Sequence, residues 1–222
     1  MFTVFSLKAQ VDVNYTQYGI GGGVSSVRGY TNLNTQFDHF AQYANFTYYY
    51  TGYIPLSFEV QKGVLSGGGV TIDPYGRAYT DNYLSFGIRG DFQLGQIIDQ
   101  DDLFSTLAKG FYSGTGVGYI INKDNVQRTN VILANGPLTY VFPGSDNSAS
   151  IVVPLRFGYE IRIMNSFNEP FIRIDIGYVQ NIVFGKGLDG YDDPAGHFKN
   201  NAPDQYRQIS LGIKFDFGSR EK

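Results

Sequence analysis

The sequence predicts an all-β chain that forms an eight-stranded antiparallel transmembrane β-barrel with one short helix outside it. Three observations predict this fold. Apolar and polar residues alternate along eight segments, glycine and aromatic residues are abundant, and long connections alternate with short ones. The 222 residues include 28 Gly, 18 Tyr and 18 Phe. Glycine disfavours helices and aromatic side chains favour strands, so a helical protein is excluded.

Eight segments carry the strand pattern, an even number, as in single-chain bacterial barrels. Five of them alternate strictly between apolar and polar residues: 54–61, 84–92, 151–163, 172–182 and 209–217. Three others are richer in glycine or aromatic residues: 17–28, 39–50 and 111–121. Successive side chains of a strand point to opposite faces, so each segment would turn one face to lipid and the other to the lumen.

The connections fall into two classes. Segments 31–37, 66–81, 123–148 and 185–205 are polar, whereas 51–53, 93–109 and 164–169 are mostly shorter. Outer-membrane barrels have short turns on the periplasmic side and long loops outside. Within the 93–109 segment, Asp101 and Asp102 are suited to cap a short periplasmic helix from Leu103 to Lys109, ended by Gly110.

Aromatic residues gather near the predicted strand ends, as the interfacial girdles of membrane barrels require. On the predicted periplasmic side these are Tyr48, Tyr49, Tyr50, Tyr53, Phe92, Phe111, Tyr112, Phe171, Phe215 and Phe217. Toward the other side they are Tyr79, Tyr83, Tyr119, Phe184 and Tyr206.

The polar faces of the strands carry charges of both signs, near the predicted periplasmic end. The candidate site residues are Glu59, Arg89, Asp91, Arg156, Glu160, Arg162, Arg173, Asp175, Lys214 and Asp216. A buried charge requires a partner, and an eight-stranded barrel is only wide enough for side chains. We therefore expect a salt-bridged lumen network with a structural role and without a continuous pore.

Composition excludes several classes of protein. The net charge of -3 gives no basic face for nucleic acid, and the absence of cysteine excludes disulfides and thiolate chemistry. No apolar run is long enough for a transmembrane helix. Residues 1–10 have the apolar stretch and small residues of the end of a secretory signal, so residues 11–222 are predicted to form a single barrel domain.

Several stretches resemble small outer-membrane barrels of Bacteroidota, of the OmpA/OmpX type. They are YGIGGGVSSVRGY, DLFSTLAKGFYSGTGVGYI, VPLRFGYEIRI and the final ISLGIKFDFG, whose late aromatic residue is similar to the C-terminal signal of such barrels. In this chain GSREK follows Phe217. The first strand is also similar to accessory barrels of the type IX secretion system, although Tyr30 follows Gly29 where those have Asp. The resemblance covers roughly residues 15–218 and implies an outer-membrane location.

Catalytic and metal-binding patterns are weak. Asp38 and His39 are similar to the acid–histidine pairs of outer-membrane proteases, but neighbouring residues on a strand face opposite ways. No serine is evident beside His39 or His197 for a Ser-His-acid set. His197 and the nearby aspartates could bind a cation, although a solvated loop explains them better. The glycine clusters lack the order of a phosphate loop, and we predict no cofactor and no metal.

These observations favour a non-enzymatic outer-membrane protein, either structural or an accessory subunit of an envelope complex for secretion, transport or assembly. Two alternatives are a narrow channel for small solutes and a barrel enzyme acting on lipid or peptide at the outer rim. The expected partners are outer-membrane lipid and other envelope proteins, reached through the 123–148 and 185–205 loops. The first of these loops is apolar enough to form either a hairpin or a contact surface.

Overall fold

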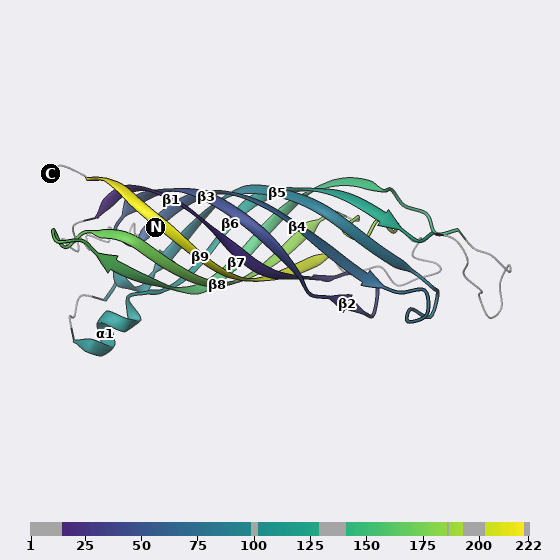
Figure 1. Ribbon diagram of the computed structural model, residues 1–222, viewed down its shortest axis with the longest axis horizontal. Helices are drawn as coiled ribbons and strands as arrows, with labels where there is room; N and C mark the ends of the chain where they lie inside the picture. Colours follow the sequence, from purple (N-terminus) through teal and green to yellow (C-terminus); the bar gives the residue numbers. More distant parts are fainter. Residues whose placement is uncertain (1–14, 99–101, 129–140, 186, 193–202, 220–222) are drawn as a thin grey trace, which may run out of the picture.

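The computed structural model of the chain describes residues 15–98, 102–128, 141–185, 187–192 and 203–219. The described part forms a closed antiparallel barrel of eight long strands, tilted around the long axis of the molecule (Figure 1). They are β1 (Thr16–Tyr30), β3 (His39–Thr51), β4 (Ile54–Gly68), β5 (Ala78–Gln93), β6 (Phe111–Val126), β7 (Asn147–Met164), β8 (Pro170–Phe184) and β9 (Gln205–Ser219). The predicted fold class is confirmed.

Each strand pairs with its neighbours in the sequence, and β1 closes the barrel by pairing with β9. The short strand β2 (Gln36–Phe37) lies on the end of β4, beyond the last pair of β3 with β4. All eight predicted segments lie within these strands.

The strands are longer than the alternation predicted. β4 continues to Gly68, β5 begins at Ala78 and β6 runs to Val126, so the predicted 66–81 and 123–148 loops are too long. The sequence signal ended early because the outward positions become polar there, as at Thr80 and Lys123, while the backbone ladder continues. The barrel wall therefore rises beyond its apolar zone.

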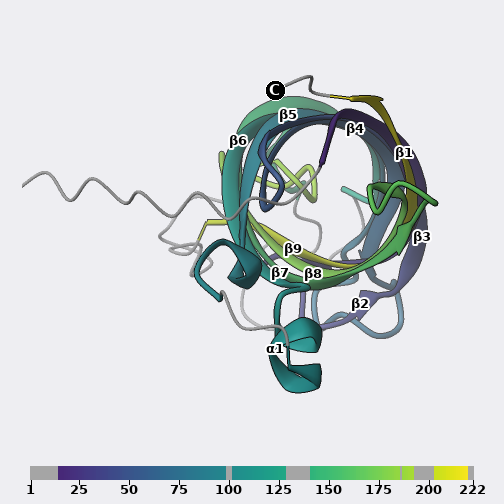
Figure 2. The same ribbon diagram turned by 90° about the vertical axis from the view of Figure 1, so that its left-hand side faces the viewer.

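The two ends of the barrel differ. One end, which we call the turn end, carries the short β3–β4 and β7–β8 connections, the start of β1 and the end of β9 (Figure 1). The other, the loop end, carries the long connections. At the turn end β5 is followed by the 3-10 helix η1 (Leu94–Gln96) and the helix α1 (Leu103–Ala108). Viewed from the turn end, α1 lies outside the barrel wall (Figure 2).

The α1 helix begins as the sequence predicted, with Asp102 as its N-cap. The Asp102 carboxylate accepts hydrogen bonds from the Ser105 backbone N–H at 3.3 Å and from the Ser105 hydroxyl at 2.5 Å. The helical residues end at Ala108, one residue before the predicted end. Within the described ranges, no helix combines the length and apolar character needed to cross a membrane.

Candidate functional site

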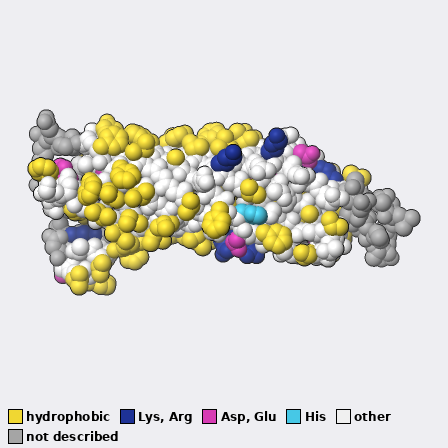
Figure 3. All heavy atoms as spheres, viewed as in Figure 1, with side chains coloured by type: hydrophobic (Ala, Val, Ile, Leu, Met, Phe, Trp, Pro, Cys, Tyr) yellow, Lys and Arg dark blue, Asp and Glu magenta, His cyan; other side chains and the backbone are white. Residues whose placement is uncertain are grey.

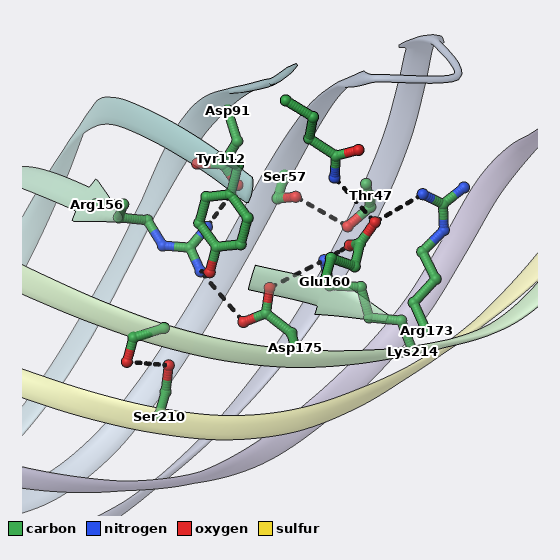
Figure 4. Close-up of polar contacts among 12 residues, drawn as sticks. Thr47, Ser57, Asp91, Tyr112, Arg156, Glu160, Arg173, Asp175, Ser210 and Lys214 are labelled. Atoms are coloured by element: carbon green, nitrogen blue, oxygen red, sulfur yellow. Dashed lines mark hydrogen bonds and ion pairs between the residues drawn. The ribbon is translucent and has the colours of Figure 1, made fainter. Parts of the chain in front are cut away.

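Ten charged side chains fill the half of the lumen nearest the turn end, and we call them the ionic cluster. Figure 4 shows part of it, with Asp91, Arg156, Glu160, Arg173, Asp175 and Lys214 labelled. They are Glu59 on β4, Arg89 and Asp91 on β5, Arg156, Glu160 and Arg162 on β7, Arg173 and Asp175 on β8, and Lys214 and Asp216 on β9. All ten are candidates from the sequence. Even the most exposed side chain, that of Glu59, keeps only 17% of its surface open. Five acids face five bases, so the cluster is formally neutral.

Glu160 lies at the centre of the cluster. One carboxylate oxygen accepts a hydrogen bond from Arg173 Nη1 at 2.8 Å, and the other accepts from Lys214 Nζ at 2.9 Å. Arg162 Nε lies 3.6 Å from the first oxygen, and Gln93 donates its amide to that oxygen at 2.9 Å. Side chains from four strands, β5, β7, β8 and β9, thus converge on this one carboxylate.

Asp175 joins this centre to a second group of charges. Its carboxylate lies 3.8 Å from Lys214 Nζ and 3.5 Å from Arg156 Nη2. Arg156 in turn bonds Asp91 through Nη1 at 2.5 Å. Asp91 and Arg156 come from β5 and β7, and Asp175 and Lys214 from β8 and β9, so the contacts run along the inner wall from β5 to β9 rather than follow one strand pair.

Aromatic rings complete the cluster. Three arginines each lie over a tyrosine ring at 4.0–5.0 Å from its centroid: Arg173 over Tyr49, Arg162 over Tyr53 and Arg156 over Tyr112. A cation over an aromatic face is attracted by the ring quadrupole, and more so when both are desolvated. Tyr49 also donates its hydroxyl to Asp216 at 3.0 Å, and Asp216 is ion-paired with Arg173.

The girdle prediction was wrong for six tyrosines. The buried ones are Tyr49, Tyr53, Tyr79, Tyr83, Tyr112 and Tyr206. Neighbouring residues on a strand face opposite ways, so Tyr49 must point inward if Tyr50, which is 62% exposed, points to lipid. The prediction took every tyrosine near a strand end as interfacial. Whether a tyrosine points to lipid or into the lumen depends instead on its place in the alternation of side chains along the strand.

Inward glycines make room for these rings. A Cβ built on Gly158 would collide with the Tyr112 hydroxyl, and one on Gly177 would lie 2.8 Å from it. In the same way, a Cβ on Gly23 would lie 2.7 Å from the Tyr43 hydroxyl. The lumen glycines therefore set where the large side chains of other strands can lie.

A second group of side chains fills the lumen toward the loop end, and we call it the apolar plug. Its buried members are Val27, Leu33, Ala41, Leu65, Tyr79, Tyr83, Ile120, Phe142, Val152, Val183, Leu188, Tyr191 and Tyr206. The rings of Tyr83 and Tyr206 meet with their centroids 5.7 Å apart. The sequence did not predict this plug, because apolar inward residues are mixed with polar ones along the strands.

A small cavity of about 50 Å³ lies between the two groups. Glu59, Arg89 and Arg156 of the ionic cluster line one part of it, and Val152 and Tyr206 of the apolar plug line another. Amide side chains of Gln61, Asn181 and Gln208 complete the lining, together with inward Gly87 and Gly118. The lumen is therefore filled toward both ends, with only this small cavity between the ionic cluster and the apolar plug.

The segment 187–192 covers the loop end of the lumen. Leu188 and Tyr191 are buried, and Tyr191 bonds the backbone of Ala78 and Gln127. Asp189 accepts a hydrogen bond from the Tyr191 backbone N–H at 3.1 Å. Burial raises the pKa of the Asp189 carboxyl, and this hydrogen bond only partly opposes the shift.

The two loops expected to contact partners are only partly described. Phe142, from the 123–148 segment, is buried against Tyr191 with the ring centroids 5.7 Å apart, so it packs over the lumen instead of forming an outer surface. Val141 beside it is 62% exposed. The remaining apolar residues of that segment lie in 129–140, outside the described residues. His197 also lies outside them, and no three described His, Asp or Glu side chains are grouped as a metal would require.

Asp38 and His39 have different partners. The Asp38 carboxylate pairs with Arg207 at 3.0 Å and Arg28 at 3.3 Å, and hydrogen bonding from Arg207 lowers the pKa of Asp38. His39 Nε2 lies 2.6 Å from the Ser66 hydroxyl. This contact of a serine with a histidine was not predicted, because it depends on the irregular segment between β2 and β3, which carries His39 to the end of β4.

The outer surface of the barrel is apolar over a broad zone (Figure 3). Large hydrophobic side chains from all eight long strands face outward there with 40–60% of their surface exposed, including Ile20, Phe46, Phe58, Leu84, Val117, Phe157, Ile176 and Leu211. We call this zone the belt. Soluble monomeric proteins rarely expose an apolar surface of this extent, whereas a closed barrel with an apolar belt is suited to a bilayer. The chain is an outer-membrane β-barrel protein. Its turn end faces the periplasm and its loop end the exterior.

No protein-family model matches the chain, and no curated protein matches it. Among solved structures it is similar to Neisserial surface protein A, with 12% identity, a TM-score of 0.44 and coverage of 90% of this chain and 97% of that one. It is also similar to Ail, the attachment invasion locus protein of Yersinia pestis, with 12% identity, a TM-score of 0.43 and coverage of 91% and 99%. The outer membrane enzyme PagL matches with 13% identity, a TM-score of 0.29 and coverage of 88% and 99%.

Proposed function

We propose that this protein is a non-conducting, non-enzymatic outer-membrane barrel that serves as a structural or accessory subunit of an envelope complex. The filled lumen is the observation that carries the proposal. A solute would have to displace both the ionic cluster, whose charges are paired, and the buried side chains of the apolar plug. Such a barrel acts through its surfaces and not through its interior.

Single-channel recording in planar bilayers tests the non-conducting part of the proposal. We expect the purified barrel to leave the bilayer silent at neutral pH. As a positive control, replacing Tyr83, Tyr206 and Glu160 together with glycine should create conductance steps, because it removes bulk from both filled levels. Discrete steps with the unmodified chain would contradict the proposal and favour the narrow channel.

Extraction from native membranes in mild detergent tests the accessory role. We expect the chain to migrate in a particle larger than its own micelle, with partner proteins of the envelope. The similarity of its first strand to type IX accessory barrels makes secretion proteins the first candidates. A chain that migrates alone in every mild detergent would leave only the structural role.

A second candidate is an acyl hydrolase at the outer rim, and the contact between His39 and Ser66 favours it. A histidine within hydrogen-bond distance of a serine can act as its general base. Among the described residues, the other ring nitrogen of His39 has no hydrogen-bond partner to orient it. Hydrolysis of a nitrophenyl fatty-acid ester, abolished in Ser66→Ala and retained in Ser26→Ala, would support this function. Equal rates in both variants would remove it.

A further inference from the structure

The helix α1 presents an apolar face that no part of the described chain covers. Leu103 is 79% exposed, Phe104 80% and Leu107 55%. Residues at positions i, i+1 and i+4 of a helix share one face, so these three side chains form a single patch. Ile97, just before the helix, is 60% exposed as well.

The position of α1 indicates what covers this patch. In Figure 1 the helix lies beside the barrel near its turn end, and in Figure 2 it projects sideways beyond the wall. Figure 3 shows its apolar side chains close to the apolar end of the belt. The patch thus extends the lipid-facing surface in the plane of the membrane.

We propose that α1 is an interfacial anchor whose face of Leu103, Phe104 and Leu107 inserts into the periplasmic leaflet of the outer membrane. Amphipathic helices that lie in this interface bury their apolar face at the boundary of headgroups and acyl chains, and keep their polar residues in water. Asp102 and Thr106 are the exposed polar residues here. The anchor fixes the depth of the barrel in the membrane and does not depend on the accessory role.

Bromine quenching of a single tryptophan tests this proposal, because the chain contains no tryptophan of its own. The Phe104→Trp variant is folded into phosphatidylcholine vesicles with bromine placed either near the headgroup or near the chain end. We expect the headgroup-proximal bromine to remove roughly half of the emission, and the deep bromine to remove clearly less, as suits an interfacial depth.

Three controls make the result specific. Ile88→Trp, at a belt position 62% exposed, should be quenched most by the deep bromine, and Ile72→Trp, in the exposed loop between β4 and β5, should not be quenched. Tryptophan itself favours membrane interfaces, so Thr106→Trp, on the polar side of α1, measures the contribution of the reporter. A heat-dependent shift in gel mobility verifies that every variant is folded.

Vesicles of pure lipid contain no other protein, so quenching at position 104 can come only from lipid. If brominated lipid left the emission of the tryptophan at position 104 unquenched, as is expected at position 72, the proposal would be overturned. Blue-shifted emission without quenching would also overturn it, since it would mean that the patch is buried against a second copy of this chain.

Discussion

At the scale of single residues, Glu160 shows how the lumen is stabilised. Its carboxylate is the shared counter-charge of Arg173, Lys214 and Arg162, and its side chain is only 1% exposed. Without this acceptor, Arg162 would lose its ion-pair partner, and Arg173 and Lys214 would keep only Asp216 and Asp175 to offset their desolvation. The energy of the cluster is therefore not a sum over independent pairs.

We expect Glu160→Gln to lower the free energy of unfolding by about 3–5 kcal/mol, because it leaves Arg162 buried without a carboxylate partner and removes one partner each from Arg173 and Lys214. Urea unfolding in detergent micelles or lipid vesicles measures the change. The double variant Glu160→Gln with Lys214→Met removes one charge of each sign and should recover a large part of the loss. A single variant as stable as Glu169→Gln, in the β7–β8 turn, would contradict the role of the cluster.

Gly158 tests the close packing around Tyr112. A valine there would place its Cβ against the Tyr112 hydroxyl and the Ile176 carbonyl oxygen, so the ring must leave Arg156. We expect Gly158→Val to destabilise the barrel by about 1–3 kcal/mol, as overpacking usually does. Thermal unfolding followed by circular dichroism measures it. Gly52→Val is the control, since a Cβ at Gly52 meets nothing closer than 3.6 Å; equal losses in both would argue against the packing explanation.

At the scale of elements, the segment 187–192 covers the loop end of the lumen and carries the buried carboxyl group of Asp189. Tyr191 joins it to the backbone near the start of β5 and the end of β6, and Leu188 fills the apolar plug. Asp189 is buried between these two residues, and its charged form is disfavoured there. The segment 187–192 should therefore be most stable at acidic pH.

The raised pKa of Asp189 determines the direction in which stability changes with pH. Its contribution to stability is complete below the unfolded pKa of about 3.8 and is lost as the pH rises through the higher folded value. We expect the melting temperature of the unmodified protein to fall as the pH rises between these two pKa values. The melting temperature of Asp189→Asn should fall less over the same range and should be the higher of the two at pH 7. Asp146→Asn, at the exposed rim, controls for the loss of a charge. Parallel pH profiles for the unmodified protein and Asp189→Asn would rule out this role.

The elements were largely predictable from the sequence, and the contents of the lumen only in part. Alternation identifies a strand whenever one face meets lipid, which is why all eight segments and the Asp102 cap could be predicted. The ten inward charges followed from the same alternation. Pairing between strands that are not adjacent, such as Asp91 of β5 with Arg156 of β7, depends on the curvature of the sheet and has no local signal. The contact of His39 with Ser66 likewise depends on an irregular strand junction.

At the scale of the whole molecule, the belt determines where the barrel can exist. Exposure of its outward apolar side chains to water is unfavourable, so acyl chains or detergent must cover them. We expect the purified chain to aggregate when amphiphile is removed, and sedimentation after detergent dilution measures this. A monodisperse chain in plain buffer would contradict the membrane assignment.

A matched pair of substitutions locates the membrane along the barrel. Ile88 lies in the belt and is 62% exposed, whereas Ile72 lies in the β4–β5 loop and is 56% exposed. We expect Ile88→Arg to cost about 2–4 kcal/mol of folding free energy in lipid vesicles, and Ile72→Arg to cost about 0–1 kcal/mol. Titration with urea in vesicles compares them. Equal costs would mean that the bilayer does not lie at the level of Ile88.

The distribution of the ionic cluster along the chain also bears on how the barrel assembles. Seven of its ten members lie on the last three strands: Arg156, Glu160, Arg162, Arg173, Asp175, Lys214 and Asp216. Most of the charged side chains on β7, β8 and β9 therefore have an oppositely charged partner within these three strands. The N-terminal strands then add Asp91 and the self-compensated pair of Glu59 and Arg89. A chain inserted from its C-terminal end would never need to carry a large unbalanced charge through hydrocarbon.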